Sequence, residues 1–364
     1  MPETDAWLPY LAETKDQNWH SNFGPITRKL EARLMEKYGS AGEAFVTASS
    51  ATSALSAALI AHRVSGHVPC PAFTFQATAG AILGAACQPF IMDVDPCTGT
   101  TTAETLAAAL DETGAKAAYV VAPYGVTRDF RDHAQVCRDR GARLIIDNAA
   151  GLGVARGTDI GMELGHDVDE IFSLHTTKVF GVGEGGLIIT HPDHVNAVKA
   201  AMNFGISAPA TVPRSDQPYW GINGKMSEVA AAVGLAVADT IDDRIAARQK
   251  MAAEWMAALD DFRDLIYCLD VSAGPWQCFP IIMPDKQSSL ALLAAMSAQD
   301  IELRRYYAPS LGDYPDYAQM DACTNSKDLS DRAAILPMRS FMPEGDRNRL
   351  METVYAGLKQ VMGS

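Results

Sequence analysis

The chain has 364 residues, of which 48% are hydrophobic and 20% are charged, and its formal net charge is −14. This length exceeds that of one typical domain, so we expect one large domain and one smaller domain. The acidic balance argues against a nucleic-acid-binding protein, because such a protein normally presents a basic face.

Short apolar runs alternate with helical stretches across the first half of the chain. The expected strands are residues 44–46, 88–94, 117–122, 143–147, 171–174 and 187–190, and the helices between them are 52–63, 102–110 and 130–140. Strands separated by helices indicate an α/β fold with a mainly parallel sheet that helices flank on both faces. Ligands of such sheets bind beyond the C-terminal ends of the strands.

The pattern changes in the second half of the chain. One long helix is expected over residues 226–256, where it can link two domains. Beyond it, we expect strands at 264–271 and 276–283 and helices at 288–298, 326–335 and 346–361. We interpret residues 1–240 as the large domain and 241–364 as a smaller α+β domain, with the N-terminal segment 1–25 packing on the small domain.

The cysteines and the N-terminus bear on the compartment. The seven cysteines are odd in number and form no CxxC pair, which favours free thiols over a disulfide framework or a zinc site. The N-terminus carries acidic residues and no apolar signal segment, and no apolar run is long enough to span a bilayer. We therefore expect a cytoplasmic protein without membrane or nucleic-acid partners.

The segment 172–186, FSLHTTKVFGVGEGG, holds Lys178 after a short strand and before a loop rich in glycine. A lysine on such a loop is either an exposed side chain on a turn or an amine held in a cleft. In a cleft, partial desolvation lowers the pKa of the amine and frees it to attack carbonyl groups. The glycine spacing GVGEGG does not indicate a dinucleotide-binding dehydrogenase, because it opens no crossover helix after a first strand.

Three other features lie at places where a cofactor binds. Asp147 ends an apolar strand, and it is either a turn or N-cap residue or a carboxylate that keeps a pyridine nitrogen protonated. Residues 49–52, SSAT, precede a helix and either cap it or seat a phosphate on free backbone N–H groups. Phe75, in the PAFTF segment, either packs in the core or stacks on a flat ring.

In order and spacing, these features resemble the DegT-type sugar aminotransferases, which are fold-type-I pyridoxal phosphate (PLP) enzymes. The resemblance runs from about residue 19 to the C-terminus. It rests on SNFGP at 21–25 with Glu31, SATSAL at 50–55, PAFTF at 71–75, DNAA at 147–150, FSLHTTK at 172–178 with GEGG at 183–186, and GINGKMSE at 221–228. The lysine segment is the most specific of these.

The resemblance implies a role for each matching residue. Lys178 would bind PLP as a Schiff base and then move the proton, as the catalytic residue. The other cofactor contacts implied are Asp147 on the pyridine nitrogen, Phe75 on the ring face, Ala150 near the ring hydroxyl, and Ser50, Ala51, Thr52 and Ser173 around the phosphate. Asn223 would reach the phosphate from a neighbouring subunit, which implies a homodimer with shared active sites. No metal-binding residues are expected in the chain.

Several positions depart from the family pattern. Ala150 replaces a glutamine that usually touches the ring hydroxyl, and a water or His175 is a candidate substitute. Ala51 replaces a glycine, Lys225 replaces an arginine, and RRYYAP at 304–309 replaces a His-Tyr-x-Pro-type segment, so substrate contacts there are expected to differ. The lysine itself is kept, whereas related dehydratases carry histidine in its place.

The activity implied is transfer of an amino group from L-glutamate to a nucleotide-linked 4-keto or 3-keto deoxysugar. Candidate substrate contacts are His175, Lys225, Arg304 and Tyr306, with Arg214 and Arg305 as further cations. For each cation the alternative is a solvated surface charge, and for His175 it is a structural role. The alternative functions are another PLP-dependent reaction on a sugar or aminocyclitol, and a regulatory relative without turnover.

Overall fold

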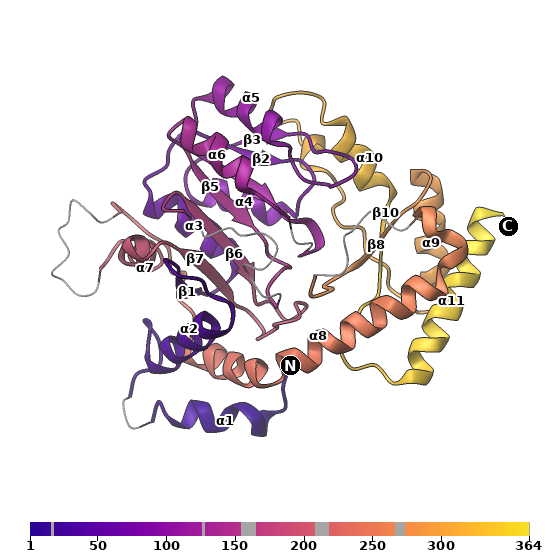
Figure 1. The fold of residues 1–364 in the computed structure, drawn as a ribbon, viewed down its shortest axis with the longest axis horizontal. Coiled ribbons are helices and arrows are strands. Elements are labelled where there is room, and N and C mark those ends of the chain that lie inside the picture. The colour runs from indigo at the N-terminus through magenta and orange to yellow at the C-terminus, as the bar shows by residue number, and fades with distance from the viewer. Residues whose placement is uncertain (16–17, 126–127, 154–164, 208–217, 266–273, 364) are drawn as a thin grey trace.

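A computed structural model describes residues 1–363 except 16–17, 126–127, 154–164, 208–217 and 266–273 (Figure 1). Its strands are β1 Ala44–Ala48, β2 His67–Pro71, β3 Gln88–Met92, β4 Ala117–Val121, β5 Arg143–Asp147, β6 Val168–Ser173, β7 Gly186–Thr190, β8 Phe279–Ile282, β9 Ala318–Gln319 and β10 Ala333–Leu336. Its α-helices are α1 Thr4–Ala12, α2 Pro25–Tyr38, α3 Ala51–Ala61, α4 Gln76–Gly84, α5 Ala103–Thr113, α6 Arg131–Asp139, α7 Val195–Ala201, α8 Glu228–Ala258, α9 Lys286–Ser297, α10 Thr324–Arg332 and α11 Glu344–Met362.

The large sheet is mainly parallel, as the alternation of strands and helices predicts. Five strands pair in the order β1-β7-β6-β5-β4, and β2 lies beside β4 and pairs with β3. The β4–β5, β5–β6 and β2–β3 pairs are parallel, whereas β7 runs antiparallel to both of its neighbours. The C-terminal ends of β5 and β6 therefore meet at the same edge of the sheet.

Helices cover both faces of this sheet, and the side chains of each strand alternate between the two layers. In β4, Val120 packs into the cluster that includes α2, α5, α6 and the first half of α8, while Tyr119 packs into the cluster of α3, α4 and α7. In β5, Ile146 and Ile145 divide in the same way. Strands buried on both faces carry continuous apolar runs, which explains why they were recognisable in the sequence.

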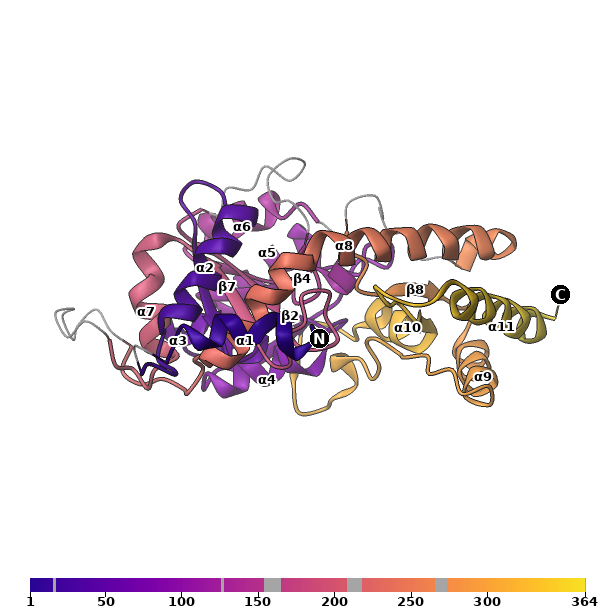
Figure 2. The ribbon, with the colours of Figure 1, turned by 90° about the horizontal axis from the view of Figure 1, so that it is seen from below.

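Helix α8 connects the two parts of the molecule (Figures 1 and 2). Its first half, with Leu235 and Ile241, belongs to a core cluster of the sheet, and its second half, with Met251 and Trp255, belongs to a separate cluster with α9, α11, β8 and β10. No helix among the described residues is long and apolar enough to cross a membrane.

The structure corrects three expectations outside the large sheet. The predicted helix 326–335 ends at Arg332, because Ala333–Leu336 is a buried strand that pairs antiparallel with β8. In the predicted strand 264–271, Asp264 and Leu265 end a 3₁₀ helix, and the remaining residues lie outside the described part of the chain. The N-terminal helix α1 packs on α8 and on the core of the sheet rather than on the small domain.

The C-terminal part also returns to the large sheet. Strand β9 adds to the edge of β3 in parallel orientation, and Leu311 and Cys323 pack into the cluster of α3, α4 and α7. This return places residues 304–307, which precede it, at the junction between the two parts.

Candidate active site

A cavity of about 320 Å³ lies at the C-terminal edge of the large sheet, where the fold predicts a ligand site. It brings together most of the residues that the sequence nominated. These are Ser50, Ala51, Thr52, Phe75, Asp147, Ala150, Ser173, His175, Lys178, Arg304 and Tyr306. They come from five separate segments of the chain, so their convergence is a property of the fold and not of local sequence.

Lys178 lies in the turn that follows β6. Its backbone N–H donates to the carbonyl of His175 at 2.8 Å, which closes the turn and holds the side chain at the cavity. Burial lowers the pKa of the Lys178 amine, and the nearby thiol of Cys278 and carboxylate of Asp147 oppose that shift. A lowered pKa increases the share of neutral amine, the form that attacks a carbonyl carbon.

Asp147 ends β5 and is buried. Its carboxylate accepts hydrogen bonds from the Thr78 hydroxyl at 2.8 Å and from the backbone N–H of Ala149 at 3.2 Å. Burial raises the pKa of this carboxyl group, while the Thr78 and Ala149 hydrogen bonds and the charge of Lys178 lower it. Among the described residues, no cation forms an ion pair with this buried carboxylate at hydrogen-bond distance, so it suits a cationic ring nitrogen.

The N-terminus of α3 forms the opposite part of the cavity. The Ser50 side chain caps the helix by accepting from Ser53 N–H at 3.1 Å. The N–H groups of Ala51 and Thr52 lie in the first turn, where the helix offers no carbonyl to accept them. A Cβ on Gly186 would lie 2.4 Å from the Ser50 backbone, so only glycine lets β7 approach this turn so closely. Free N–H groups at a helix N-terminus suit a phosphate.

The ring contacts predicted from the sequence also line the cavity. Phe75 is 54% exposed, an unusual value for a phenylalanine beside a buried site, and its ring meets Tyr306 edge to face at 6.5 Å. Ala150 offers no polar group. The side-chain oxygen of Gln277, also in the cavity wall, is buried and has no hydrogen-bond partner among the described residues. A bound molecule with a donor group at this position would satisfy it.

Sequence reasoning missed the residues that join the two parts of the molecule at the cavity. The Tyr124 hydroxyl donates to the carbonyl of Tyr306 at 2.6 Å, and the Tyr124 N–H donates to the Tyr307 hydroxyl at 3.3 Å. The Tyr124 and Tyr307 rings stack 5.5 Å apart with an 8° interplanar angle. Thr78 and Cys278 were also missed. Tyr307 lies in the RRYYAP segment, where the sequence predicted altered substrate contacts, although it was not itself nominated. Tyr124, Thr78 and Cys278 lie in no glycine-rich or charged motif, so the sequence alone carried no signal for these three.

Other candidates lie elsewhere. Asn223 is exposed and accepts from the Lys225 amine at 2.8 Å, and neither residue lines the cavity of its own chain. Arg305 turns away and donates to the Ser330 carbonyl at 3.1 Å. Arg214 lies outside the described residues.

His175 lines the cavity and has local partners. Its Nδ1 lies 2.9 Å from the Thr177 hydroxyl, and its Nε2 lies 3.6 Å from the Glu184 carboxylate. Its backbone N–H donates to the Ser173 hydroxyl at 3.2 Å, so the histidine also orients a predicted phosphate contact. The structural and functional interpretations of this histidine are therefore compatible.

The chain is similar to known proteins over nearly its whole length. Residues 3–355 match the DegT/DnrJ/EryC1/StrS aminotransferase family. Protein Rv3402c of Mycobacterium tuberculosis is 28% identical, over 93% of this chain and 83% of its own length. The dTDP-4-amino-4,6-dideoxy-D-glucose transaminase of Shigella dysenteriae is 26% identical, over 97% and 96%. The crystal structure of DesI with its TDP-sugar product superimposes with a TM-score of 0.87 at 26% identity, over 100% of this chain and 92% of DesI.

The cavity fits PLP group by group: an amine for its aldehyde carbon, a buried carboxylate for its ring nitrogen and a helix N-terminus for its phosphate. The family match and the cavity agree on the same cofactor and the same type of reaction. The chain belongs to the DegT/DnrJ/EryC1/StrS aminotransferase family and is a PLP-dependent aminotransferase.

Proposed function

We propose that this aminotransferase moves an amino group from L-glutamate to a nucleotide-linked keto-deoxysugar with its carbonyl at C4 or C3. The Shigella dysenteriae transaminase, whose name specifies a dTDP-linked amino sugar, and DesI, solved with a TDP-sugar product, support this substrate class. Both align with nearly the whole of this chain, so the likeness includes the segments that wall the cavity.

The observation that carries the proposal is the shape of the space around Lys178. Thr177, Gln277, Cys278, Arg304 and Tyr306 line both the enclosed cavity and a second, more open one of about 1000 Å³. An amino acid alone needs no such space. An enclosed catalytic compartment that opens into a wide outer one suits a substrate whose sugar reacts inside while its nucleotide remains outside.

The outer cavity carries positive groups on a strongly acidic chain. Arg248, Arg304, Arg339 and Arg349 line it, together with the acids Asp300, Glu302 and Asp346. The buried guanidinium of Arg248 is fixed by the carbonyls of Trp276 and Gln277 at 2.9 and 3.1 Å. Guanidinium groups are the usual partners of diphosphates, because their N–H groups match phosphate oxygens in geometry.

In this proposal, Lys178 moves the proton that transamination requires. PLP, when bound, supplies the electron sink that stabilises a carbanion at the α-carbon of the amino donor. The Asp147 carboxylate keeps the ring nitrogen protonated, and the free N–H groups of α3 hold the phosphate. The Lys178 amine takes a proton from the substrate carbon, in a site whose burial favours its neutral form.

We also propose a homodimer in which the partner subunit's Asn223 reaches the phosphate. Its exposed position outside its own cavity supports this. Phe204, Tyr219 and Trp220 lie close by and are also exposed, by 56%, 79% and 42%. An exposed apolar patch of this kind marks a surface that another chain covers.

A spectroscopic half-reaction tests the function. The PLP-loaded enzyme is mixed with L-glutamate, and the absorbance band of lysine-bound PLP is followed. We expect conversion to the pyridoxamine form, and then recovery of the band when dTDP-, UDP- or GDP-linked 4-keto-6-deoxyhexoses are added one at a time. Loss of the band with glutamate but no recovery with any 4-keto or 3-keto nucleotide sugar would refute the acceptor, and no change with glutamate would refute the donor.

Mixed dimers test the shared site. Lys178→Ala and Asn223→Ala proteins, each weakly active, are mixed under conditions that exchange subunits. If Asn223 acts across the interface, hybrids regain activity, because one of their two sites contains both native residues. No recovery, with exchange confirmed by light scattering and differential tagging, would refute the shared site.

A further inference from the structure

Half of the histidines of the chain gather at the N-terminal edge of the large sheet, at the opposite end of β6 from the catalytic cavity. These are His62, His166, His191 and His194, of the eight histidines in the sequence. The ring centroids of His166 lie 4.9 Å from those of His191 and 4.3 Å from those of His194. Neither the catalytic cavity nor the outer one includes any of them.

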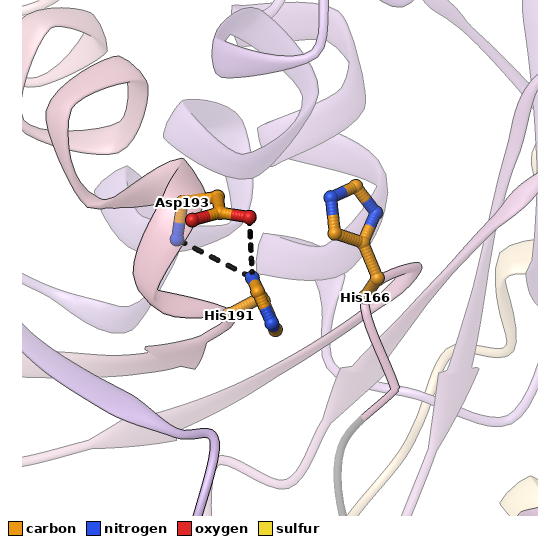
Figure 3. A group of neighbouring side chains, drawn as sticks. All are labelled: His166, His191 and Asp193. Atoms are coloured by element: carbon orange, nitrogen blue, oxygen red, sulfur yellow. Dashed lines mark hydrogen bonds and ion pairs between the residues drawn. The ribbon is translucent and has the colours of Figure 1, made fainter.

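Two of these histidines and a neighbouring aspartate bring their ligand atoms close together. His166 precedes β6, while His191 and Asp193 follow β7, and these two strands are antiparallel neighbours, so both segments meet at the same edge. Ligand atoms of His166, His191 and Asp193 all lie within 4.8 Å of one another. Figure 3 shows one ring nitrogen of His166 facing Asp193 and His191, while its other nitrogen faces away.

One separation between ligand atoms is close to the value that a metal ion imposes, and the others lie within 4.8 Å. His191 Nδ1 lies 3.4 Å from an Asp193 carboxylate oxygen. A tetrahedral zinc ion with bonds of about 2.1 Å holds its ligand atoms roughly 3.4 Å apart. His166 and Asp193 are exposed and His191 is half-buried, so modest side-chain rotation brings the third ligand to the same distance. The backbone N–H of Asp193 donates to His191 Nδ1 at a long 3.3 Å, and a metal would replace that weak bond.

Neighbouring groups hold the ligands in place. The Nδ1 of His166 lies 3.3 Å from the Asp167 carboxylate, which leaves Nε2 as the ligand atom, the arrangement in which a carboxylate orients a metal-bound histidine. The Arg143 guanidinium donates to the His166 carbonyl at 3.1 Å and to His194 Nε2 at 2.9 Å. The charge of Arg143 is offset by the buried carboxylate of Asp169 at 3.5 Å.

We propose that His166, His191 and Asp193 form a binding site for a divalent transition metal, with Zn²⁺ as the best fit and water completing the coordination. Two imidazoles and one carboxylate are ligands that suit Zn²⁺, Ni²⁺ and Cu²⁺ rather than Mg²⁺ or Ca²⁺. The ion links the start of β6 to the turn after β7. Its role is structural, because the six residues of β6, at about 3.3 Å each, separate it by roughly 20 Å from Ser173 at the cavity.

Calorimetric titration of the tag-free, PLP-loaded enzyme with Zn²⁺ tests the site. The variants His166→Gln, His191→Gln and Asp193→Asn each remove one ligand, and His20→Gln, at an exposed histidine in a different loop, is the matched control. We expect one Zn²⁺ per chain in the wild type and the control. Each ligand variant should bind at least tenfold more weakly, since even the loss of a supporting partner costs about 10–100-fold in metal affinity.

Two further readouts separate this site from adventitious binding. Zn²⁺ should raise the melting temperature of the wild type and not that of the triple variant, while kcat with saturating substrates stays the same in both. Co²⁺ in place of Zn²⁺ should give visible d–d bands without thiolate charge-transfer bands. Zn²⁺ binding that persists unchanged in the triple variant, thiolate bands with Co²⁺, or no stoichiometric binding by the wild type would each overturn the proposal.

Discussion

The two walls of the catalytic cavity differ in origin and in the kind of residue that they contribute. The large-domain wall carries Lys178, Asp147 and the N-terminus of α3. These fit the aldehyde, the ring nitrogen and the phosphate of PLP, respectively. The other wall comes from the C-terminal part and carries aromatic rings, an amide, a thiol and an arginine, which belong to Gln277, Cys278, Arg304, Tyr306 and Tyr307. The first wall suits the cofactor, which stays bound. The second wall suits the substrates, which enter and leave.

The two walls take their side chains from different kinds of backbone. The residues that we expect to contact the cofactor lie at the ends of buried strands and at the start of a helix, where the sheet fixes the backbone. Substrate-facing groups sit on connections between elements, which vary without disturbing the core. The Tyr124–Tyr307 stack joins the walls, so the second wall is positioned by the first. Substitutions on the two walls should accordingly affect different kinetic constants.

The largest effect is expected at the cofactor wall. Asp147→Asn keeps the shape and the acceptor for Thr78, but it removes the charge that we propose keeps the ring nitrogen of PLP protonated. We expect kcat to fall by roughly 10²–10³-fold, the typical loss for a removed electrostatic contact in an active site, with PLP still bound. Steady-state kinetics and the absorbance of the holoenzyme measure both. A fall of less than threefold would show that the carboxylate does not serve the ring.

A smaller effect is expected at Thr78, one step behind Asp147. Thr78→Val removes a hydrogen bond that lowers the pKa of Asp147, so that pKa rises further. We expect activity to require the carboxylate form of Asp147. As the pH is lowered, the variant should therefore lose activity at a higher pH than the wild type does, so the acid limb of its pH–rate profile shifts to higher pH. We expect kcat to fall by at least about tenfold, since a hydrogen bond to a charged group contributes about 1.5–3 kcal/mol and each 1.36 kcal/mol is a factor of about ten.

Thr74→Val is the matched control for that prediction. Thr74 bonds the Thr78 hydroxyl at 2.7 Å but does not itself touch the carboxylate. Its pH profile should stay close to that of the wild type. Equal upward shifts in both variants would mean that general loosening of the site, and not the bond to Asp147, moves the profile.

On the second wall, Arg304→Gln should alter substrate binding more than the cofactor. The Arg304 side chain is 47% exposed and donates to the Tyr306 hydroxyl at 2.8 Å. We expect a rise of about two- to fivefold in KM for the nucleotide sugar with little change in kcat, because an exposed ionic contact contributes about 0.2–1 kcal/mol. Arg305→Gln, outside the cavity, should leave KM unchanged. A large fall in kcat for Arg304→Gln would remove the distinction between the walls.

The smallest effect is expected where the walls meet. Tyr307→Phe keeps the ring stack on Tyr124 and removes the hydroxyl that accepts from the Tyr124 N–H. We expect a loss of about 0.5–1.5 kcal/mol in stability, seen as a melting temperature a few degrees lower. Tyr314→Phe, at a partly exposed tyrosine outside the cavity, serves as the comparison. Identical melting temperatures for Tyr307→Phe and wild type would mean that this bond does not hold the second wall.

The large sheet was largely predictable because its strands are buried on both faces. Arg143–Asp147 was predicted to the residue, since a run of apolar side chains bounded by charge has few other solutions in an α/β fold. Strand β2 was missed because its sequence, HVPCP, contains two prolines, which are uncommon in a paired strand. Strand β10 was missed because its apolar run continues a helical pattern, and only its pairing with β8 makes it a strand.

The candidate site was predictable only in part, for a related reason. Asp147 ends an apolar strand and Lys178 precedes a glycine-rich loop, so both lie in local motifs that can be recognised from the sequence. Cys278, Tyr307 and Gln277 reach the cavity through the docking of the second part of the molecule, which no local pattern encodes. The sequence did not predict the group of His166, His191 and Asp193 for the same reason. Its members come from segments 25 or more residues apart, and they meet only when β6 and β7 pair.

Lys178 is the residue that we expect to bind PLP. Reduction of the holoenzyme with borohydride converts the lysine–PLP linkage into a stable bond, and peptide mass spectrometry then locates the label. We predict a single pyridoxyl label on the peptide that contains Lys178, and none in the Lys178→Ala protein. A label on any other lysine of the wild type, or an unlabelled Lys178 peptide in protein that carries the PLP absorbance band, would contradict the account.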